Sequence, residues 1–193
     1  MNILLDIWVI LSLHIVIKVD TLNVCKPEII KKIFEINGHP KCILNTNSDL
    51  GHLTFYSVPK ADRTPGIKCV KGYVDPPCNK SADAHTIYYF DDTTIAPLQQ
   101  DWKQYDEENG YVKELDSSNN VFHLYYLNVD KVYCYYRCAN HMKTAGSDFA
   151  AVAVTIGTQH DPDVLKAVAE CKRRLKAVGL CVDLEDIETC TEY

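Results

Sequence analysis

The segment VFHLYYLNVDKVYCYYRC, residues 121–138, decides the fold. Residues 121–127 and 131–138 are both rich in aromatic and aliphatic side chains, and the turn 128–130 separates them. Tyrosine and β-branched residues favour extended backbone, and a short interruption between two such runs is typical of a β-hairpin. The segment therefore predicts two adjacent antiparallel strands.

Similar runs occur on both sides of this hairpin, with turn residues between them. The strands expected from them are 53–58, 67–74, 85–90, 111–115, 121–127, 131–138 and 149–156. Short strands separated by polar turns indicate a mainly β protein, an antiparallel meander that either closes as a barrel or packs as a sandwich.

Pairs of tyrosines stand next to each other in these strands, at 88–89, 125–126 and 135–136. Successive side chains of a strand point to opposite faces of the sheet. One set of tyrosines could therefore line an interior cavity while the other packs beneath a helix. The alternative is that the pairs reflect only the preference of tyrosine for strands.

Two helices flank the strands. Pro27 suits a first helical position, and apolar residues at 29, 30, 33 and 34 predict a short N-terminal helix packed on the body of the fold. Later, Asp161 is a good N-cap before Pro162, and Gly179 is a good stop. Between them one apolar stripe of a C-terminal helix is formed by Val164, Val168, Cys171, Leu175 and Val178.

The first residues are typical of a secretory leader. Residues 3–17 are almost all apolar, which is too short for a comfortable membrane span but suits a signal peptide. We expect residues 1–19 to be a signal peptide and residues 20–193 to be one domain, secreted to the extracellular space. A membrane anchor or a buried helix are the alternatives for this segment.

The chain has 9 cysteines, which indicates a disulfide framework. Cys134 and Cys138 lie on one face of a strand at roughly 13 Å from each other, too far to bond together. We expect Cys171, on the buried stripe of the helix, to bond to one of them. We expect Cys190 to bond to a strand cysteine such as Cys69. Because the count is odd, one thiol is free or pairs with another chain.

Several functional classes lack support in the sequence. A net charge of -6 gives no basic footprint for nucleic acid. The metalloprotease, α/β-hydrolase, phosphate-loop and dinucleotide motifs are all missing, so the sequence predicts neither an enzyme nor a cofactor. Cys134, Cys138 and His141 could form one corner of a metal site, but no second ligand pair with metal spacing follows. We therefore expect no metal site, and no membrane partner once the leader is removed.

The order of elements, many antiparallel strands followed by one capped helix and a tail, resembles that of a lipocalin. Residues 156–163 (IGTQHDPD) are similar to the lipocalin passage from the last barrel strand to its helix. Residues 67–70 (IKCV) and 122–134 resemble strands of the tick salivary, histamine-binding-like lipocalins, as do the late cysteines at 171, 181 and 190. The resemblance implies an up-and-down barrel, stapled by disulfides, with a short N-terminal helix and one C-terminal helix packed outside.

A barrel of about eight strands can hold one small ligand. The expected ligand is a small hydrophobic or amphipathic molecule, either a lipid mediator or a biogenic amine such as histamine. Tick amine binders often carry an Asp after the strand cysteine, whereas Tyr135 follows Cys134 here. The candidate lining residues are Phe55, Tyr56, Tyr89, Trp102, Phe122 and Tyr125. About half of them should face away, because a strand presents only alternate residues to one side.

Acidic residues at 91, 92, 101 and 106 could pair with an amine, although solvated loop positions are the simpler expectation. The alternative function is a secreted protein-binding module that acts through its loops on a partner such as a host defence protein. Asn79 begins an N-x-S sequon in a polar turn, so we expect an N-glycan there.

Overall fold

The computed structural model describes residues 25–59, 66–139, 149–180 and 184–191. The expected signal peptide, His141 and Cys181 lie outside these ranges. The helices are α2 (Pro27–Asn37), α3 (Ile43–Asp49) and α4 (Pro162–Ala177). The strands are β1 (Leu53–Pro59), β2 (Ile67–Val74), β3 (Ser81–Phe90), β4 (Leu98–Asp106), β5 (Tyr111–Leu115), β6 (Val121–Tyr126), β7 (Val132–Ala139), β8 (Phe149–Thr155) and β9 (Leu184–Asp186). Among the described residues, no helix is long and apolar enough to cross a membrane.

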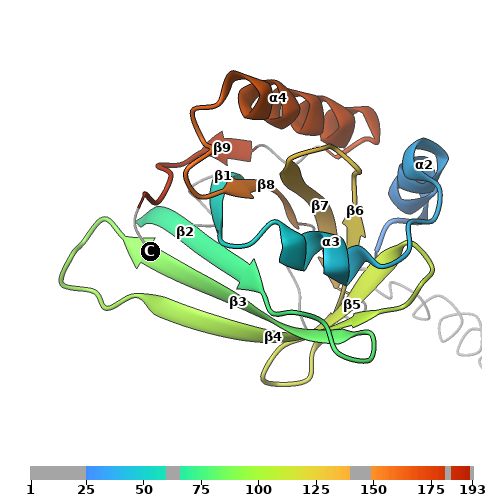
Figure 1. The fold of residues 1–193 in the computed structure, drawn as a ribbon, viewed down its shortest axis with the longest axis horizontal. Helices are drawn as coiled ribbons and strands as arrows, with labels where there is room; N and C mark the ends of the chain where they lie inside the picture. The colour runs from blue at the N-terminus through green and yellow to red at the C-terminus, as the bar shows by residue number, and fades with distance from the viewer. Residues whose placement is uncertain (1–24, 60–65, 140–148, 181–183, 192–193) are drawn as a thin grey trace, which may run out of the picture.

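The strands form one closed antiparallel barrel (Figure 1). Each strand from β2 to β7 pairs with the next one along the chain, and β1 closes the sheet by pairing with both β8 and β2. β9 adds to the free end of β1, where Ser57 is paired with Asp186. Of the two expected arrangements, the barrel is therefore confirmed and the sandwich is not formed.

The buried residues divide into two clusters that lie on opposite faces of the sheet. The inner cluster fills the barrel and includes Leu53, Phe55, Val70, Val112, Leu124, Tyr126, Tyr133 and Tyr135. The outer cluster lies between the sheet and the helices α2 and α4 and includes Ile29, Ile33, Tyr125, Tyr136, Val152, Val168 and Leu175. Tyr126 and Tyr135 thus face inward while their neighbours Tyr125 and Tyr136 face the helices, so alternation, rather than strand preference alone, accounts for these pairs.

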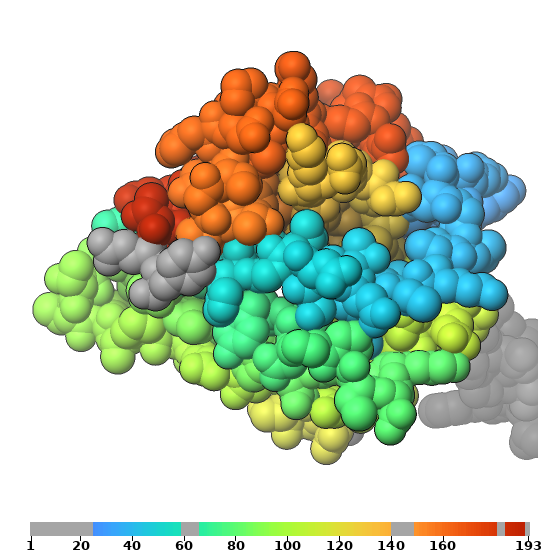
Figure 2. All heavy atoms as spheres, in the orientation of Figure 1, coloured from blue at the N-terminus to red at the C-terminus, as the bar shows by residue number. Residues whose placement is uncertain are grey.

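The helix α4 begins and ends where its sequence signals predict. The Asp161 side chain accepts a hydrogen bond from the backbone N–H of Asp163, and all five residues of the apolar stripe are buried. Gly179 adopts φ +92°, and the N–H of Leu180 then donates to the carbonyl of Leu175. The apolar stripe lies on β7 and β8, and α4 runs along the top of the molecule in Figure 2.

Three disulfides join distant parts of the described chain. Cys69 bonds to Cys190, the two cysteines that the sequence analysis paired, and this linkage attaches the tail to β2. Of the two partners left open for Cys171, the structure has Cys134. The other, Cys138, bonds to Cys25 and so fixes the start of the described chain to the barrel. Cys42 and Cys78 are free and exposed.

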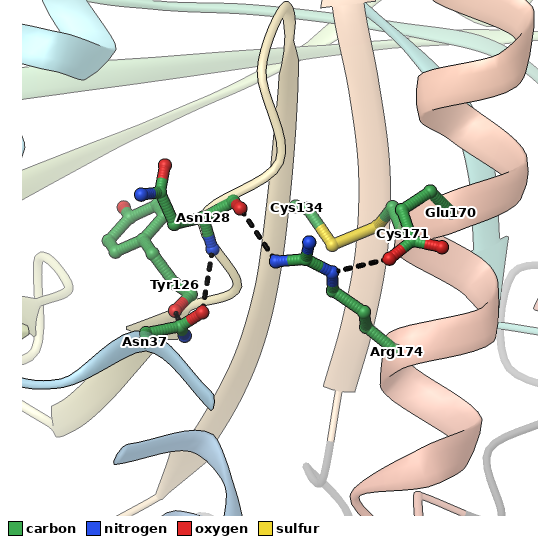
Figure 3. Close-up of a disulfide and its surroundings, with 7 residues drawn as sticks. All are labelled: Asn37, Tyr126, Asn128, Cys134, Glu170, Cys171 and Arg174. Atoms are coloured by element: carbon green, nitrogen blue, oxygen red, sulfur yellow. Dashed lines mark hydrogen bonds and ion pairs between the residues drawn. A yellow bond between two sulfur atoms is a disulfide. The ribbon is translucent and has the colours of Figure 1, made fainter. Parts of the chain in front are cut away.

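The β6–β7 turn connects the two outer helices (Figure 3). At the end of α2, Asn37 donates from Nδ2 to the carbonyl of Tyr126 and accepts at Oδ1 from the N–H of Asn128. From α4, Arg174 donates to the carbonyl of Asn128 at 2.8 Å and is held by Glu170 at 2.7 Å. These bonds, beside the Cys134–Cys171 disulfide, fix both helices to the same hairpin.

Three elements were not predicted from the sequence. β4 was missed because its outer face is polar and its inner face carries glutamines, so it lacks the expected apolar alternation. α3 has only seven residues, too few for a helical period to be visible. β9 has only three residues and exists because it can pair with β1. Of these, α3 matters most for the interior, since Ile43 and Leu44 belong to the inner cluster and cover one end of the barrel.

Candidate ligand-binding site

The barrel encloses a cavity of about 370 Å³. Alternate residues of β3 and β4 face it, including Ala84, Thr86 and Tyr88 on the first strand and Gln100, Trp102 and Gln104 on the second. Apolar side chains from β1, β2, β6 and β8 supply the remaining wall, among them Leu53, Phe55, Val70, Leu124 and Phe149. Phe90 and Leu98 lie at the end nearest the β3–β4 hairpin, and Leu98 is 49% exposed, so the cavity opens at that end.

The six candidate lining residues divide as strand alternation requires. Phe55 and Trp102 line the cavity. Phe122 is buried in the inner cluster, with its ring centroid 6.0 Å from that of Trp102 in an edge-on arrangement, and it supports the wall rather than forming it.

The other three candidates are corrected by the structure. Tyr56 and Tyr125 face the outer cluster, and Tyr89 lies on the outer face, where Lys71 stands over its ring. Each is one residue away from a side chain that does face inward, so the choice between neighbours, and not the choice of strand, was wrong.

A buried polar cluster lies in the wall of the cavity, with the Glu114 carboxylate at its centre. Arg137 donates from Nε to one carboxylate oxygen at 2.7 Å, and Gln104 donates from Nε2 to the other at 2.8 Å. The side chains of Arg137 and Glu114 are 14% and 6% exposed, and Gln104 as a residue is 2% exposed. The charges cancel within the cluster, which is the condition under which an interior tolerates them.

Aromatic rings cover the guanidinium of Arg137. Its central carbon lies 3.5 Å from the centroid of the Phe122 ring and 4.5 Å from the centroid of the Trp102 ring. Stacking of this kind suits the planar, weakly hydrated guanidinium better than it suits an ammonium group. The rings and Glu114 together fix the position of Arg137 at the cavity wall.

Neutral tyrosines make up the rest of the polar surface. The hydroxyls of Tyr126 and Tyr133 lie 2.7 Å apart and share a hydrogen bond. Burial raises the pKa of both groups, and it also raises the pKa values of Tyr135 and Tyr88. All four hydroxyls therefore keep their protons at neutral pH, and the cluster gains no further charge.

The acidic residues considered for an amine lie elsewhere. Asp91 and Asp92 are exposed beyond β3, and the Asp101 carboxylate accepts from His85 and Gln99 on the outer surface. The Asp106 carboxylate accepts from the backbone N–H of Glu108. Glu114 is the one carboxylate among the described cavity-lining residues, and Arg137 already neutralises it.

Sequence reasoning missed Gln104, Glu114 and Arg137. A signal was present in β7, since Arg137 is in phase with Tyr133 and Tyr135 in an otherwise apolar strand. A single charge at an inward position requires a buried partner, but a single sequence does not show which residue supplies it.

Two further features are the glycosylation sequon at Asn79 and the arrangement of side chains that can bind metal ions. Asn79 is exposed in the turn between β2 and β3, where Cys78 and Ser81 form an isolated bridge, and its glycosylation stays a prediction. No group of three or more His, Cys, Asp or Glu side chains in the described ranges is arranged to hold a metal ion.

Comparison with solved structures identifies this architecture. No protein-family model matches the sequence, and no curated protein sequence matches it. Apocrustacyanin C2 superposes with a TM-score of 0.59 at 17% identity, over 88% of this chain and 91% of that chain. H1 crustacyanin from the lobster Homarus americanus gives 0.58 at 15% identity, over 91% and 94%. Japanin from Rhipicephalus appendiculatus, solved bound to cholesterol, gives 0.51 at 11% identity, over 75% and 95%.

Identities this low carry information about the fold alone. Crustacyanin and Japanin are lipocalins, and the similarity to them spans the barrel and most of this chain. The protein therefore has the lipocalin fold.

Proposed function

We propose that this protein is a secreted carrier that sequesters one small hydrophobic or amphipathic molecule inside its barrel. The observation that carries the proposal is the cavity of about 370 Å³, whose wall is mostly apolar and aromatic with a few convergent polar groups. Pockets of this size and composition are typical of small-molecule sites. A role as a binder rather than a catalyst is part of the same proposal.

Two further observations support it. Japanin, which has a similar fold, was solved with cholesterol bound, which shows that a barrel of this type can accommodate a bulky apolar ligand. Three disulfides in a chain of this size favour an oxidising compartment, and the apolar residues 3–17 favour export through a signal peptide.

Native mass spectrometry of the unreduced protein, expressed through a secretory route, tests the proposal. We expect a chain shortened by about 20 residues that carries one noncovalent small molecule, and we expect that mass to disappear on denaturation. A ligand-free chain that takes up no apolar compound from a test panel would contradict the carrier role. It would favour the alternative, recognition of a partner protein through the loops.

Two adjacent residues of β3 provide a matched pair of variants for this test. Thr86 lines the cavity, whereas Ile87 is on the other face of the strand. Thr86→Trp should fill the space and abolish retention of the ligand, while Ile87→Trp should leave it unchanged. Equal retention by the two variants would show that the ligand is bound outside the barrel.

A further inference from the structure

We propose that the C-terminal tail, residues 184–190, is a strap that keeps a cleft in the side of the barrel closed and so controls how fast the ligand enters and leaves. This inference rests on the proposed function, because it assumes that the barrel holds a small molecule. It goes further by assigning the part of the wall that opens and the bond that keeps it shut.

The cleft lies between β1 and β2, the two strands that close the barrel. Within the described ranges these strands pair at two positions, Leu53 with Gly72 and Thr54 with Lys71. The rest of each strand has no partner in the other, so the two strands separate along most of their length. Because Ile67 at the start of β2 is paired with Phe90, the separated halves lie at the end where the cavity opens.

Both borders of the cleft belong to the cavity wall. Phe55 and Val58 line the cavity from β1, and both follow the two paired positions. Ile67 and Val70 line it from β2, and both precede the paired positions. At this place a ligand in the barrel is therefore separated from solvent by what fills the cleft, and not by a continuous sheet.

The tail fills the cleft from the side of β1. β8 occupies one edge of β1, so β2 and β9 share the other edge, where β9 pairs with residues 57–59. Farther along, the N–H of Ile187 donates to the carbonyl of Tyr56 at 3.2 Å. The N–H of Cys190 donates to the hydroxyl oxygen of Thr54 at 2.8 Å. The Ile187 side chain packs against the inner cluster, and in Figure 1 the red tail runs from β9 toward the start of β2.

One covalent bond attaches the tail to the other border of the cleft. Cys69 on β2 bonds to Cys190, whereas the described residues show no backbone hydrogen bond between the tail and β2. Lys68 and Glu188 form an ion pair at 3.9 Å, but their side chains are 46% and 65% exposed, so this pair contributes little. The tail is thus joined to β1 by its backbone and to β2 by the disulfide, and loss of that bond should allow the cleft to open.

The kinetics of ligand exchange test the strap directly. Stopped-flow mixing of the oxidised, secreted protein with the neutral dye Nile red gives the association rate constant. Mixing the loaded protein with excess phosphatidylcholine vesicles gives the dissociation rate constant. Cys69→Ala with Cys190→Ala should raise both constants at least about tenfold, because the disulfide makes separation of the two borders at least that much less favourable. A gate speeds entry and exit alike, so the Kd should stay unchanged.

A second disulfide provides the matched control. Cys134→Ala with Cys171→Ala also removes one disulfide, but this bond joins β7 to α4, away from the cleft. The control should lose stability and keep both rate constants within about twofold of the unaltered protein. Ile187→Ala keeps every disulfide and removes most of the side chain that packs against the inner cluster. It should raise both rate constants at least about threefold, and it tests the strap even if the tail double variant does not fold.

The outcomes separate the strap from the carrier role. Unchanged rate constants in the tail variants, or faster dissociation alone with a weaker Kd, would overturn the strap and leave the carrier role intact. Equal acceleration in the control would also overturn it, since loss of any disulfide would then loosen the barrel. If the unaltered protein takes up neither Nile red nor 1-decanol, the carrier role is wrong and the strap is wrong with it.

Discussion

Removing the positive charge of Arg137 should be among the most destabilising single changes in the barrel. The Arg137→Met variant keeps most of the apolar stem, but it leaves the Glu114 carboxylate buried with the hydrogen bond from Gln104 and without its ion pair. Breaking a buried ion pair in this way costs about 3–5 kcal/mol. Because the pair borders a cavity that opens to solvent, we expect the lower end, about 3 kcal/mol.

The assay is urea unfolding of the disulfide-intact protein, followed by circular dichroism and by tryptophan fluorescence to test for two-state behaviour. The double variant Arg137→Met with Glu114→Leu removes both charges, and it should recover about 2 kcal/mol of the loss. Recovery should be incomplete because Gln104 then loses its acceptor.

Lys103 and Asp83 provide the control. They pair at 3.0 Å on the outer face, with side chains 45% and 51% exposed. Lys103→Met should therefore lower stability by no more than about 1 kcal/mol. The reasoning fails if Arg137→Met is as mild as this control, or if the double variant loses the sum of the two single changes.

Three further predictions concern the scaffold and the site. Replacing Cys134 and Cys171 together with Ala opens a loop of 37 residues, and thermal and urea unfolding should show a loss of up to about 4 kcal/mol; an unchanged midpoint would contradict a bond between them. Burial lowers the pKa of His123, so the unfolded chain binds more protons than the folded chain, and stability should fall as the pH decreases from about 7 to about 5. His123→Gln should remove that part of the pH dependence, and identical stability profiles for the variant and the unaltered protein would refute the prediction. Trp102 lines the cavity, so its fluorescence emission should change as ligand saturates the barrel, and this change should be lost in Trp102→Phe. An unaltered emission spectrum, with binding detected by calorimetry, would place the ligand elsewhere.

The strands and helices that form the barrel are predictable because their patterns are local. Residues 121–138 contain a complete hairpin, and Asp161 with Gly179 marks both ends of α4. β4 shows the limit of such patterns. Gln104 is buried because the strands on either side of β4 cover it, and the composition of β4 does not indicate this burial, so a search for apolar alternation misses the strand.

The site was only partly predictable, for a related reason. Strand alternation predicts that neighbours point to opposite faces, but the face that is inside depends on register across the whole barrel. Phe55 and Trp102 therefore line the cavity while Tyr56 and Tyr125 lie on the outer face, and a ligand-binding role for Phe55 and Trp102 stays a prediction.

Long-range pairing is the other missing information. Cys25 and Cys138 are 113 positions apart in the sequence, and only the folded chain brings them together. The same holds for Glu114 and Arg137, which come from strands that are not neighbours in the sheet. Neither contact has a signature in the local sequence, so the structure was needed to find the centre of the polar cluster.

A crystal structure of the protein, purified from a secretory host and soaked with 1-decanol, tests the central claim most directly. The account predicts one ligand inside the barrel, in contact with Phe55 and Trp102. A barrel that stays free of ligand at saturating 1-decanol, or a ligand bound only on the outer surface, would contradict it.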